Sequence, residues 1–450
     1  MTECKTELPF DFPQPRPLDV QFSDLELSSD AGLLLVRQAD ERMGLTAAIA
    51  SCIEEWRDPA KVTHSLTRLV QQRVYQIIGG YEDANDSTDL RHDPIYKIVC
   101  GRLPEAGENL LASQPTISRL ENQVTRRDLG QIRGQYIDRF IERHQTAPRA
   151  VTLDIDGWDA PTYGDQQLSL FHGYYGHQMY YPVQINEATS GYPLVLQLRP
   201  GNSHPGKGVA GLLRWLFWRL RRAWPGVQIT LRADSGFSLP EIVRACERAQ
   251  VNYVLGYSGN AVLKRKIQPL LEQSRVVACL NETGKARLFD DVYYAAESWS
   301  EPRRIVMKAE WLPKGPNPRF VLTNLDLPPQ VLYDQVYVQR GAASEHPIKE
   351  LKVGLQAKRL SCHDALANQF RLLLTQAAYV LMLSLRHAAA DTPLAHAQVE
   401  RLRSTLIKTA ARVRVSARRI LVELAAYCPW ADTIRHIAHQ LMAPNPWVLA

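Results

Sequence analysis

The sequence has few cysteines and no paired ones, since seven are scattered over 450 residues and no C-x-x-C pair occurs. It therefore indicates neither a disulfide framework nor a zinc cluster, and a reducing cytoplasm is expected. Long apolar runs are also missing. The most apolar helical stretch, residues 372–385, is too short and too polar to span a bilayer, and no charged-then-apolar leader opens the chain. We expect no membrane segment.

The sequence also has no large excess of charge of one sign. The chain has 53 basic and 47 acidic side chains and a net charge of +6. This balance permits a polyanionic partner without requiring one. With 45% apolar residues, the chain can bury a large core and should divide into two or three domains. Function must therefore be sought in motifs rather than in composition.

Helical patterning fills the first third of the chain after a Pro-rich leader at residues 7–20. Amphipathic segments begin at residue 33 and run through about 60–78 and 109–144. In the stretch ASQPTISRLENQVTRR, Ser113 is a candidate N-cap, and Arg119 belongs to a polar face. This segment could be a DNA recognition helix with Arg119 as a contact, and a plain surface helix explains the pattern equally well.

The residue pattern predicts two strands that each end in a carboxylate. In AVTLDIDG, apolar residues at 151, 153 and 155 alternate with polar ones until Gly157, which predicts a buried strand that delivers Asp156 at its C-terminal end. Asp154, two residues earlier on the same face, is the alternative. VQITLRADSGF repeats the arrangement with Asp234. For either residue alone, capping of the next turn is the more ordinary explanation.

The order of the predicted elements indicates a fold. Two further antiparallel strands are expected within residues 167–200, then a helix at 208–224, the strand before Asp234, a helix at about 240–250 and a strand at 252–257. This order is that of a ribonuclease-H-like fold, in which the first and fourth strands are neighbours. Asp156 and Asp234 would then lie together as a divalent-metal site.

A second strand-rich tract follows between residues 260 and 325, with predicted strands RVVACLNE, ARLFDDVYYAAES, RRIVMKAEWL and RFVLTNL. We interpret it as a β-rich insertion that delays the last helix of the core. That helix is predicted to begin near Pro347, with Glu345 just before it as the third acid. The segment from about residue 399 onward is predicted to be helical and is basic at its start.

The resulting fold class is α/β. A ribonuclease-H-like catalytic core with a β-rich insertion is preceded by a mainly helical N-terminal DNA-binding region and followed by C-terminal helices. The predicted boundaries are 1–147 for the N-terminal region, 148–259 for the first part of the core, 260–328 for the insertion, 329–392 for the completion of the core with the Glu345 helix, and 393–450 for the C-terminal helical segment.

These stretches resemble the DDE transposases of the IS4-like superfamily, and most of all the IS1380 family of bacterial insertion sequences. In the core the resemblance is carried by LDIDGWDAPTYGDQ, LFHGYYG, LRPGNSHPGKG and LRADSGF, and in the first region by AGLLLVRQADERMGL and LASQPTISRLEN. The superfamily signature of Tyr, Arg, Glu and Lys is matched by Tyr337, Arg340, Glu345 and Lys352. The chain has one extra residue between Arg340 and Glu345, and His346 stands where the family tends to have Asn.

The resemblance implies a transposase that cleaves DNA at terminal inverted repeats and transfers the ends to target DNA. It implies two Mg²⁺ ions, for which Mn²⁺ can substitute, held by the catalytic residues Asp156, Asp234 and Glu345. Arg340 and Lys352 would contact phosphates and Tyr337 a displaced nucleotide.

The implied partners are double-stranded DNA and, in the DNA complex, a second copy of the chain to form a homodimer. The implied location is the bacterial cytoplasm, at the nucleoid when bound to DNA. The departures from the signature leave an alternative, a catalytically silent DNA-binding protein on the same scaffold.

Overall fold

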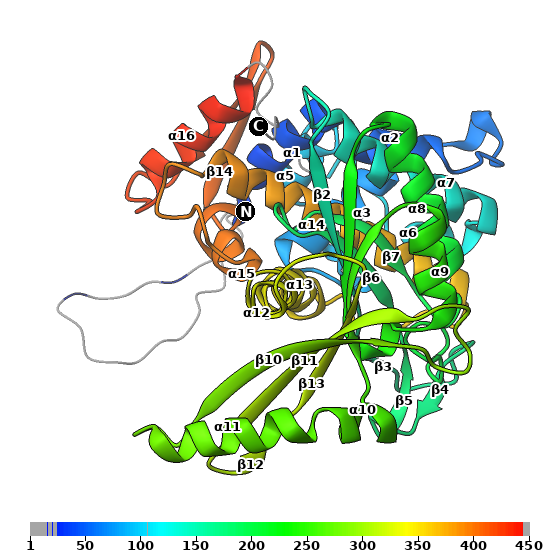
Figure 1. Ribbon diagram of the computed structural model, residues 1–450. Coiled ribbons are helices and arrows are strands. Elements are labelled where there is room, and N and C mark those ends of the chain that lie inside the picture. Colours follow the sequence, from blue (N-terminus) through cyan, green and yellow to red (C-terminus); the bar gives the residue numbers. More distant parts are fainter. Residues whose placement is uncertain (1–15, 17–19, 21–24, 106, 444–450) are drawn as a thin grey trace.

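The computed structural model describes residues 16, 20, 25–105 and 107–443, with the side chains of 342–344 excluded (Figure 1). The Pro-rich leader expected at 7–20 lies almost wholly outside these residues. Figure 1 shows a mixed α/β molecule with one large sheet and helices packed against it. No helix in the described part of the chain is both long and apolar enough to cross a membrane.

The first third of the described chain is mainly helical, in agreement with the sequence pattern. Its helical elements are α1 (Leu33–Met43), α2 (Leu45–Ser51), η1 (Pro59–Lys61), α3 (Leu66–Gly79), η2 (Ala84–Asp86), α4 (Ser87–Leu90), α5 (Pro94–Val99), α6 (Gln114–Gln123) and α7 (Arg126–Glu142). α7 begins at a capping box formed by Thr125 and Asp128. Several of these helices contact α14 (Ala365–Ala388), whose residues are almost all buried. α14 is therefore the centre of the helical layer.

The central sheet has nine strands among the described residues. Across the sheet their order is β7 (Pro193–Gln197), β6 (Val183–Glu187), β2 (Ala150–Gly157), β8 (Gln228–Ala233), β9 (Asn252–Tyr257), β13 (Arg319–Thr323), β11 (Arg303–Leu312) and β10 (Ala286–Tyr294), with β12 (Gly315–Pro316) paired to β11. β2, β8 and β9 are mutually parallel, and the other pairs are antiparallel. The parallel strands are connected through α8 (Val209–Ala223) and α9 (Pro240–Arg248), as parallel pairing requires.

The tract after β2 divides between two sheets. β4 (Leu170–His172) and β5 (His177–Tyr180) form a small sheet with β3 (Ala160–Pro161), whereas β6 and β7 join the central sheet. The two antiparallel strands that the sequence predicted in this tract are therefore four short ones in two hairpins.

The register of β2 and β8 brings their C-terminal ends together. Ile155 pairs with Ala233 in the parallel ladder, so the next residues are Asp156 and Asp234. Asp234 caps a short 3₁₀ turn, η3 (Ser235–Phe237). Because neighbouring parallel strands end at the same edge of a sheet, both carboxylates lie at that edge, as the strand order predicted.

The region between β9 and β10 corrects one prediction. The strand expected at 275–282 is wrong, since these residues belong mostly to the helix α11 (Gln268–Leu280), which follows α10 (Ala261–Lys266). The buried residues of α11 recur at helical spacing, while Val276 and Val277, which favoured a strand, are exposed. The three later strands are confirmed as β10, β11 and β13. They extend the central sheet, and Figure 1 shows α11 lying along them.

One nearly continuous helical run leads from the sheet towards α14. It comprises α12 (Pro329–Val331), η4 (Leu332–Tyr337), α13 (Gln339–Lys349) and η5 (Glu350–Gly354). The prediction that this helix begins near Pro347 is wrong, because Pro347 lies inside α13 and Pro329 occupies the first-turn position instead. η4 and η5 are π-helical. Such segments are rare and frequently mark functional sites.

The segment from residue 399 onward is only partly helical, so the prediction of a helical C-terminal segment is wrong in part. The helical elements α15 (Val399–Leu402), η6 (Arg403–Ile407) and α16 (Ala431–Met442) flank a hairpin of β14 (Ala411–Ser416) and β15 (Arg419–Leu424), to which β1 (Leu27–Ser28) adds a third strand. In β14, Val413 is buried between the exposed Arg412 and Arg414. This period of two belongs to a strand. Residues 444–450 of the predicted segment lie outside the described chain.

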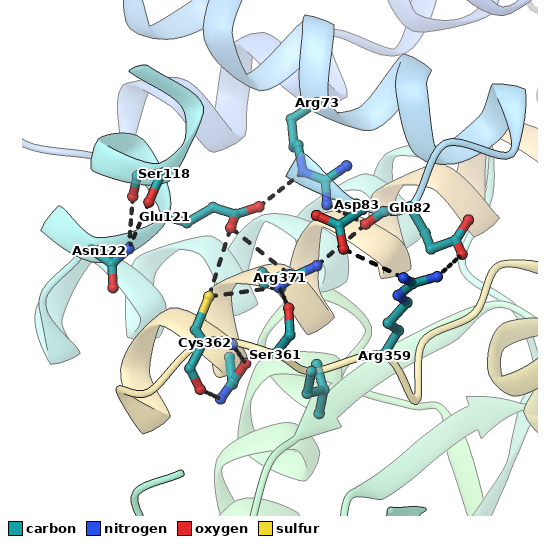
Figure 2. A network of polar contacts seen from close by, with 12 residues as sticks. Arg73, Glu82, Asp83, Ser118, Glu121, Asn122, Arg359, Ser361, Cys362 and Arg371 are labelled. Carbon is teal, nitrogen blue, oxygen red and sulfur yellow. Dashed lines mark hydrogen bonds and ion pairs between the residues drawn. The ribbon is translucent and has the colours of Figure 1, made fainter. Parts of the chain in front are cut away.

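A buried ionic network attaches the N-terminal helices to α14 (Figure 2). Arg73 of α3 and Arg371 of α14 pair with Glu121 of α6 at N–O distances of 2.8 and 3.8 Å. All three side chains are more than nine-tenths buried. Removing one member of a buried ion pair leaves an uncompensated charge, which costs several kcal/mol. The N-terminal helices therefore share a core with α14 rather than forming a loosely tethered unit.

Candidate active site

The acidic cluster predicted from the sequence lies where β2 and β8 end. Asp156, whose side chain is 21% exposed, accepts a hydrogen bond from the amide of Gly157 at 2.8 Å through Oδ1. Its Oδ2 pairs with Nη1 of Arg340 at 3.1 Å. Asp234 accepts a hydrogen bond from the amide of Gly236 at 2.9 Å. The two acids are thus held by local turns, and one of them also by an arginine from α13.

The negative charge of Asp156 is only partly compensated by Arg340. Burial and the negative charge of Asp234 raise the pKa of Asp156 to about 6, although Arg340 opposes the shift. A raised carboxyl pKa means that the ionised form is poorly compensated by its surroundings. A divalent cation with carboxylate ligands would supply this compensation. The donor chemistry of Asp156 and Asp234 therefore fits such an ion.

Tyr337 and Arg340 extend the site from the helical run. The guanidinium carbon of Arg340 lies 6.0 Å from the ring centre of Tyr337. A Cβ placed on Gly256 would approach the Tyr337 hydroxyl oxygen to 2.6 Å and the carbonyl carbon of Asp234 to 3.2 Å. Because Gly256 in β9 has no side chain, the Tyr337 hydroxyl can lie beside Asp234.

Lys352 pairs with Asp159, an acid just beyond the end of β2. Its Nζ lies 2.5 Å from Oδ1 of Asp159, and the two side chains are 25% and 21% exposed. Asp159 follows the end of β2 by two residues. No periodicity or spacing in the sequence relates Asp159 to Lys352, which lies in η5, so this pair could not be found before the fold was known.

Glu345 does not join the acidic cluster. Its side chain is exposed on α13, and no hydrogen bond or ion pair reaches it from the described residues. Five helical steps separate Arg340 from Glu345, a rotation of about 140° around the axis, whereas the four steps of the superfamily signature give about 40°. The extra residue therefore lies within the helix α13 and not in a loop before it. Among the residues described, no three His, Cys, Asp or Glu side chains form a group that could hold a metal.

Asp154 lies apart from this edge in a buried salt bridge. Its side chain is fully buried, and both carboxylate oxygens accept hydrogen bonds of 2.7 Å from Arg232 of β8. Nη1 of Arg232 also donates to the carbonyl oxygen of Val336 in η4 at 3.0 Å. Sequence reasoning missed Arg232, although its position two residues before Asp234 repeats that of Asp154 before Asp156. The bridge connects both strands of the acidic pair to the helical run.

Arg119 is exposed on α6 and borders a basic pocket of about 290 Å³. Arg57, Lys61 and His64 line the same pocket. Burial, and then the charges of Arg102 and two further arginines, lower the pKa of His64 to about 4. The arginines around His64 suit an anionic partner, although Arg57 also pairs with Glu55 and Lys61 with Asp58. α6 lies far along the chain from the acidic pair and contributes no residue to it.

Comparison with known proteins identifies the family. The family model described as "Transposase DDE domain group 1" matches residues 11–445. No curated protein matches the chain. Among solved structures, the chain is similar to that described as "Cryo-EM structure of piggyBac transposase synaptic complex with hairpin DNA (SNHP)". The TM-score is 0.42 and the sequence identity 12%, over 94% of this chain and 85% of that one.

The family match carries the assignment by itself, because it extends over nearly the whole chain. This chain belongs to the DDE transposases of domain group 1, a family of enzymes that cleave and transfer DNA.

Proposed function

We propose that this protein is an active transposase of the IS1380 family that cleaves DNA at the terminal inverted repeats of its own element and joins the ends to target DNA. The observation that carries the proposal is the pairing of Asp156 and Asp234 at adjacent strand ends with Arg340 beside them. The strand order β7-β6-β2-β8-β9 supports a ribonuclease-H-like core. We assign residues 148–259 and 329–392 to this core and 260–328 to an insertion.

Asp156 and Asp234 are the proposed ligands of Mg²⁺, and Glu345 is the third acid by its place in the signature. Carboxylate oxygens are the ligands that Mg²⁺ and Mn²⁺ prefer. Two bound ions would stabilise the attacking and leaving oxygens of an in-line displacement at phosphorus. We leave Asp154 out of the proposed ligands, because both of its carboxylate oxygens accept hydrogen bonds from Arg232.

The basic residues of the signature are proposed to hold the DNA strand. Arg340 and Lys352 now pair with Asp156 and Asp159, and each side chain is still partly exposed. A guanidinium or ammonium group that already donates to a carboxylate oxygen is oriented to donate to a phosphate oxygen in its place. Tyr337 offers a ring on which a displaced nucleotide can stack.

The basic surface around Arg119 is the proposed contact of the N-terminal region with the terminal repeat. Arg119→Ala should weaken binding of different duplexes about equally and reduce the slope of log affinity against log salt by about one, since one phosphate contact is lost. Fluorescence anisotropy with a terminal-repeat duplex over a range of salt concentrations measures both effects. Arg275→Ala, which removes an exposed arginine from α11, is the matched control. An unchanged slope for Arg119→Ala would exclude this contact.

A second function is favoured by one observation. Glu345 is exposed and does not group with the acidic pair, so a DNA-binding protein that no longer cleaves is the alternative. Such a protein would occupy the repeats without turnover. The two functions share the same DNA-binding surfaces and differ only in catalysis.

Cleavage of an end-labelled duplex that carries the element's terminal repeat tests the proposal. The wild-type chain should cut at the repeat boundary with Mg²⁺ or Mn²⁺ and should not cut with EDTA. Two chains should be present in the complex that pairs the two ends. Specific binding of the repeat without any cutting in either metal would establish the second function, and absence of specific binding would contradict both.

A further inference from the structure

A pocket of about 500 Å³ lies apart from the acidic pair, between α7, the β6–β7 turn, α13 and the C-terminal part of α14. Its wall contains two arginines, three histidines and the acid Glu350. The basic residues that line it are Arg143, His346, Arg386, His387 and His396. The remaining wall includes the turn residues Thr189, Ser190 and Gly191.

Arg143 is the unusual member of this set. It follows the last residue of α7 and is 7% exposed, yet its Nε and Nη1 are buried without a hydrogen-bond partner among the described residues. Its guanidinium carbon lies 5.3 Å from the ring centre of Tyr192, which is a partial substitute for a counter-charge. Burial lowers the pKa of Arg143. A buried cation without an anion is costly, so such a group is normally paired.

Two acids of this region form their hydrogen bonds with other groups: Glu187, whose charge acts on Arg143, and Glu350, which lines the pocket. Glu187 accepts hydrogen bonds from the amides of Thr189 and Ser190 at 2.9 and 2.7 Å and from the Ser190 hydroxyl at 2.6 Å. Glu350 pairs with Arg386 at 3.0 Å and also accepts from the Tyr379 hydroxyl at 2.8 Å. Neither acid forms an ion pair with Arg143 in the described structure. The buried guanidinium of Arg143 therefore borders open volume without a directly bonded anion among the described residues.

A structural role as a helix cap would be the ordinary explanation for an arginine at this place. Arginines near the C-terminal end of a helix often bond the last carbonyl oxygens. Here Nε and Nη1 of Arg143 bond no carbonyl of α7 or of any other described residue. His387, in the last turn of α14, has a pKa that is lowered by burial and by the charge of Arg143. Both groups would be stabilised by the same anion.

We propose that this pocket binds a phosphate group, with Arg143 as the main contact and His387 and His396 as further donors. The phosphate can belong to the DNA backbone or can be free inorganic phosphate. The DNA source rests on the proposed function, and the free source does not. Because His346 and Pro347 of α13 line the pocket, a bound phosphate would contact the helix that carries Arg340 and Glu345.

Isothermal titration of the full-length protein with inorganic phosphate tests the site. The wild type should bind saturably, and Arg143→Met should weaken binding about tenfold or more, because a charge-assisted contact is lost. Arg214→Met, which removes an exposed arginine from α8, should bind as the wild type does. Ala395→Trp, which fills the pocket but leaves Arg143 in place, should also weaken binding. Ala395→Trp still tests the site if Arg143→Met does not fold. Thermal unfolding shows whether each variant is folded.

A second titration distinguishes the sources. Displacement of phosphate by a terminal-repeat duplex assigns the site to the DNA backbone, and retention of phosphate in the saturated DNA complex assigns it to the free ion. The proposal is overturned if the wild type shows no saturable phosphate binding, or if Ala395→Trp and folded Arg143→Met bind as tightly as the wild type. Failure of the proposed function would instead appear as absence of cleavage, whatever the phosphate titration shows.

Discussion

Asp156→Asn and Asp234→Asn should each reduce strand cleavage at the terminal repeat by a factor on the order of 10³, as expected when charge that stabilises the transition state is removed. Asparagine keeps the size of the side chain and the hydrogen bonds to the turn amides at Gly157 and Gly236. DNA affinity should stay within about twofold of the wild type or increase, since negative charge near phosphates is lost. Initial cleavage rates at saturating protein, together with anisotropy binding curves, measure the two effects.

The matched control for these variants is Asp290→Asn, an exposed acid on β10 far along the sheet from the pair. It should cleave as the wild type does. Wild-type cleavage by Asp156→Asn or by Asp234→Asn would remove that residue from the proposed site. Glu345→Gln belongs in the same experiment, because it decides whether the exposed Glu345 takes part. A loss as large as that of the aspartates would require α13 to rearrange in the DNA complex, and full activity would exclude Glu345 as the third acid.

Asp154→Asn and Arg232→Met should each lower the free energy of unfolding by about 3 to 5 kcal/mol. Each change leaves one buried charge of the Asp154–Arg232 pair without its partner. Arg232→Met also removes the hydrogen bond to the Val336 carbonyl oxygen, so its effect should be the larger of the two. Urea denaturation followed by circular dichroism and by tryptophan fluorescence measures the change, and agreement of the two probes justifies a two-state treatment.

The double variant Asp154→Leu/Arg232→Met provides the control for the buried pair. It removes both charges together, so it should recover much of the stability lost in either single variant. An exposed pair serves for comparison. Arg414→Ala, which breaks the surface pair with Glu423, should cost no more than about 1 kcal/mol. Losses of that small size for Asp154→Asn and Arg232→Met would show that the bridge does not hold the two strands and η4 together.

Local signals in the sequence were sufficient for the strands that carry the acids. The period of two in residues 151–156, ended by Gly157, predicted β2, and the same pattern predicted β8 before Asp234. Strand order then predicted the neighbourhood of Asp156 and Asp234, because parallel neighbours end at a common edge. The role of this pair as metal ligands remains a prediction.

The wrong predictions have a common cause. Val276 and Val277 favoured a strand through their side-chain type, but the residues buried in α11 follow a helical spacing. In β14, the alternation of Arg and Val was overlooked in favour of the charge of the segment. Pro347 favours a helix start by its residue type, but Pro329 lies upstream in the same helical run and occupies the first turn. In each case the type of one or two residues favoured a structure that the spacing of the buried residues or the longer helical run did not support.

The sequence by itself determined that the chain is a DDE transposase, which strand ends carry Asp156 and Asp234, and that the first third is helical. These properties depend on periodicity and on motifs within short stretches. Tertiary structure alone decided which charges meet: Arg340 with Asp156, Lys352 with Asp159, and Arg232 with Asp154. It also left Arg143 without an ion pair among the residues that the structure describes. The physical reason is that an ion pair depends on distance in space, and residues far apart along the chain carry no spacing signal that could reveal it.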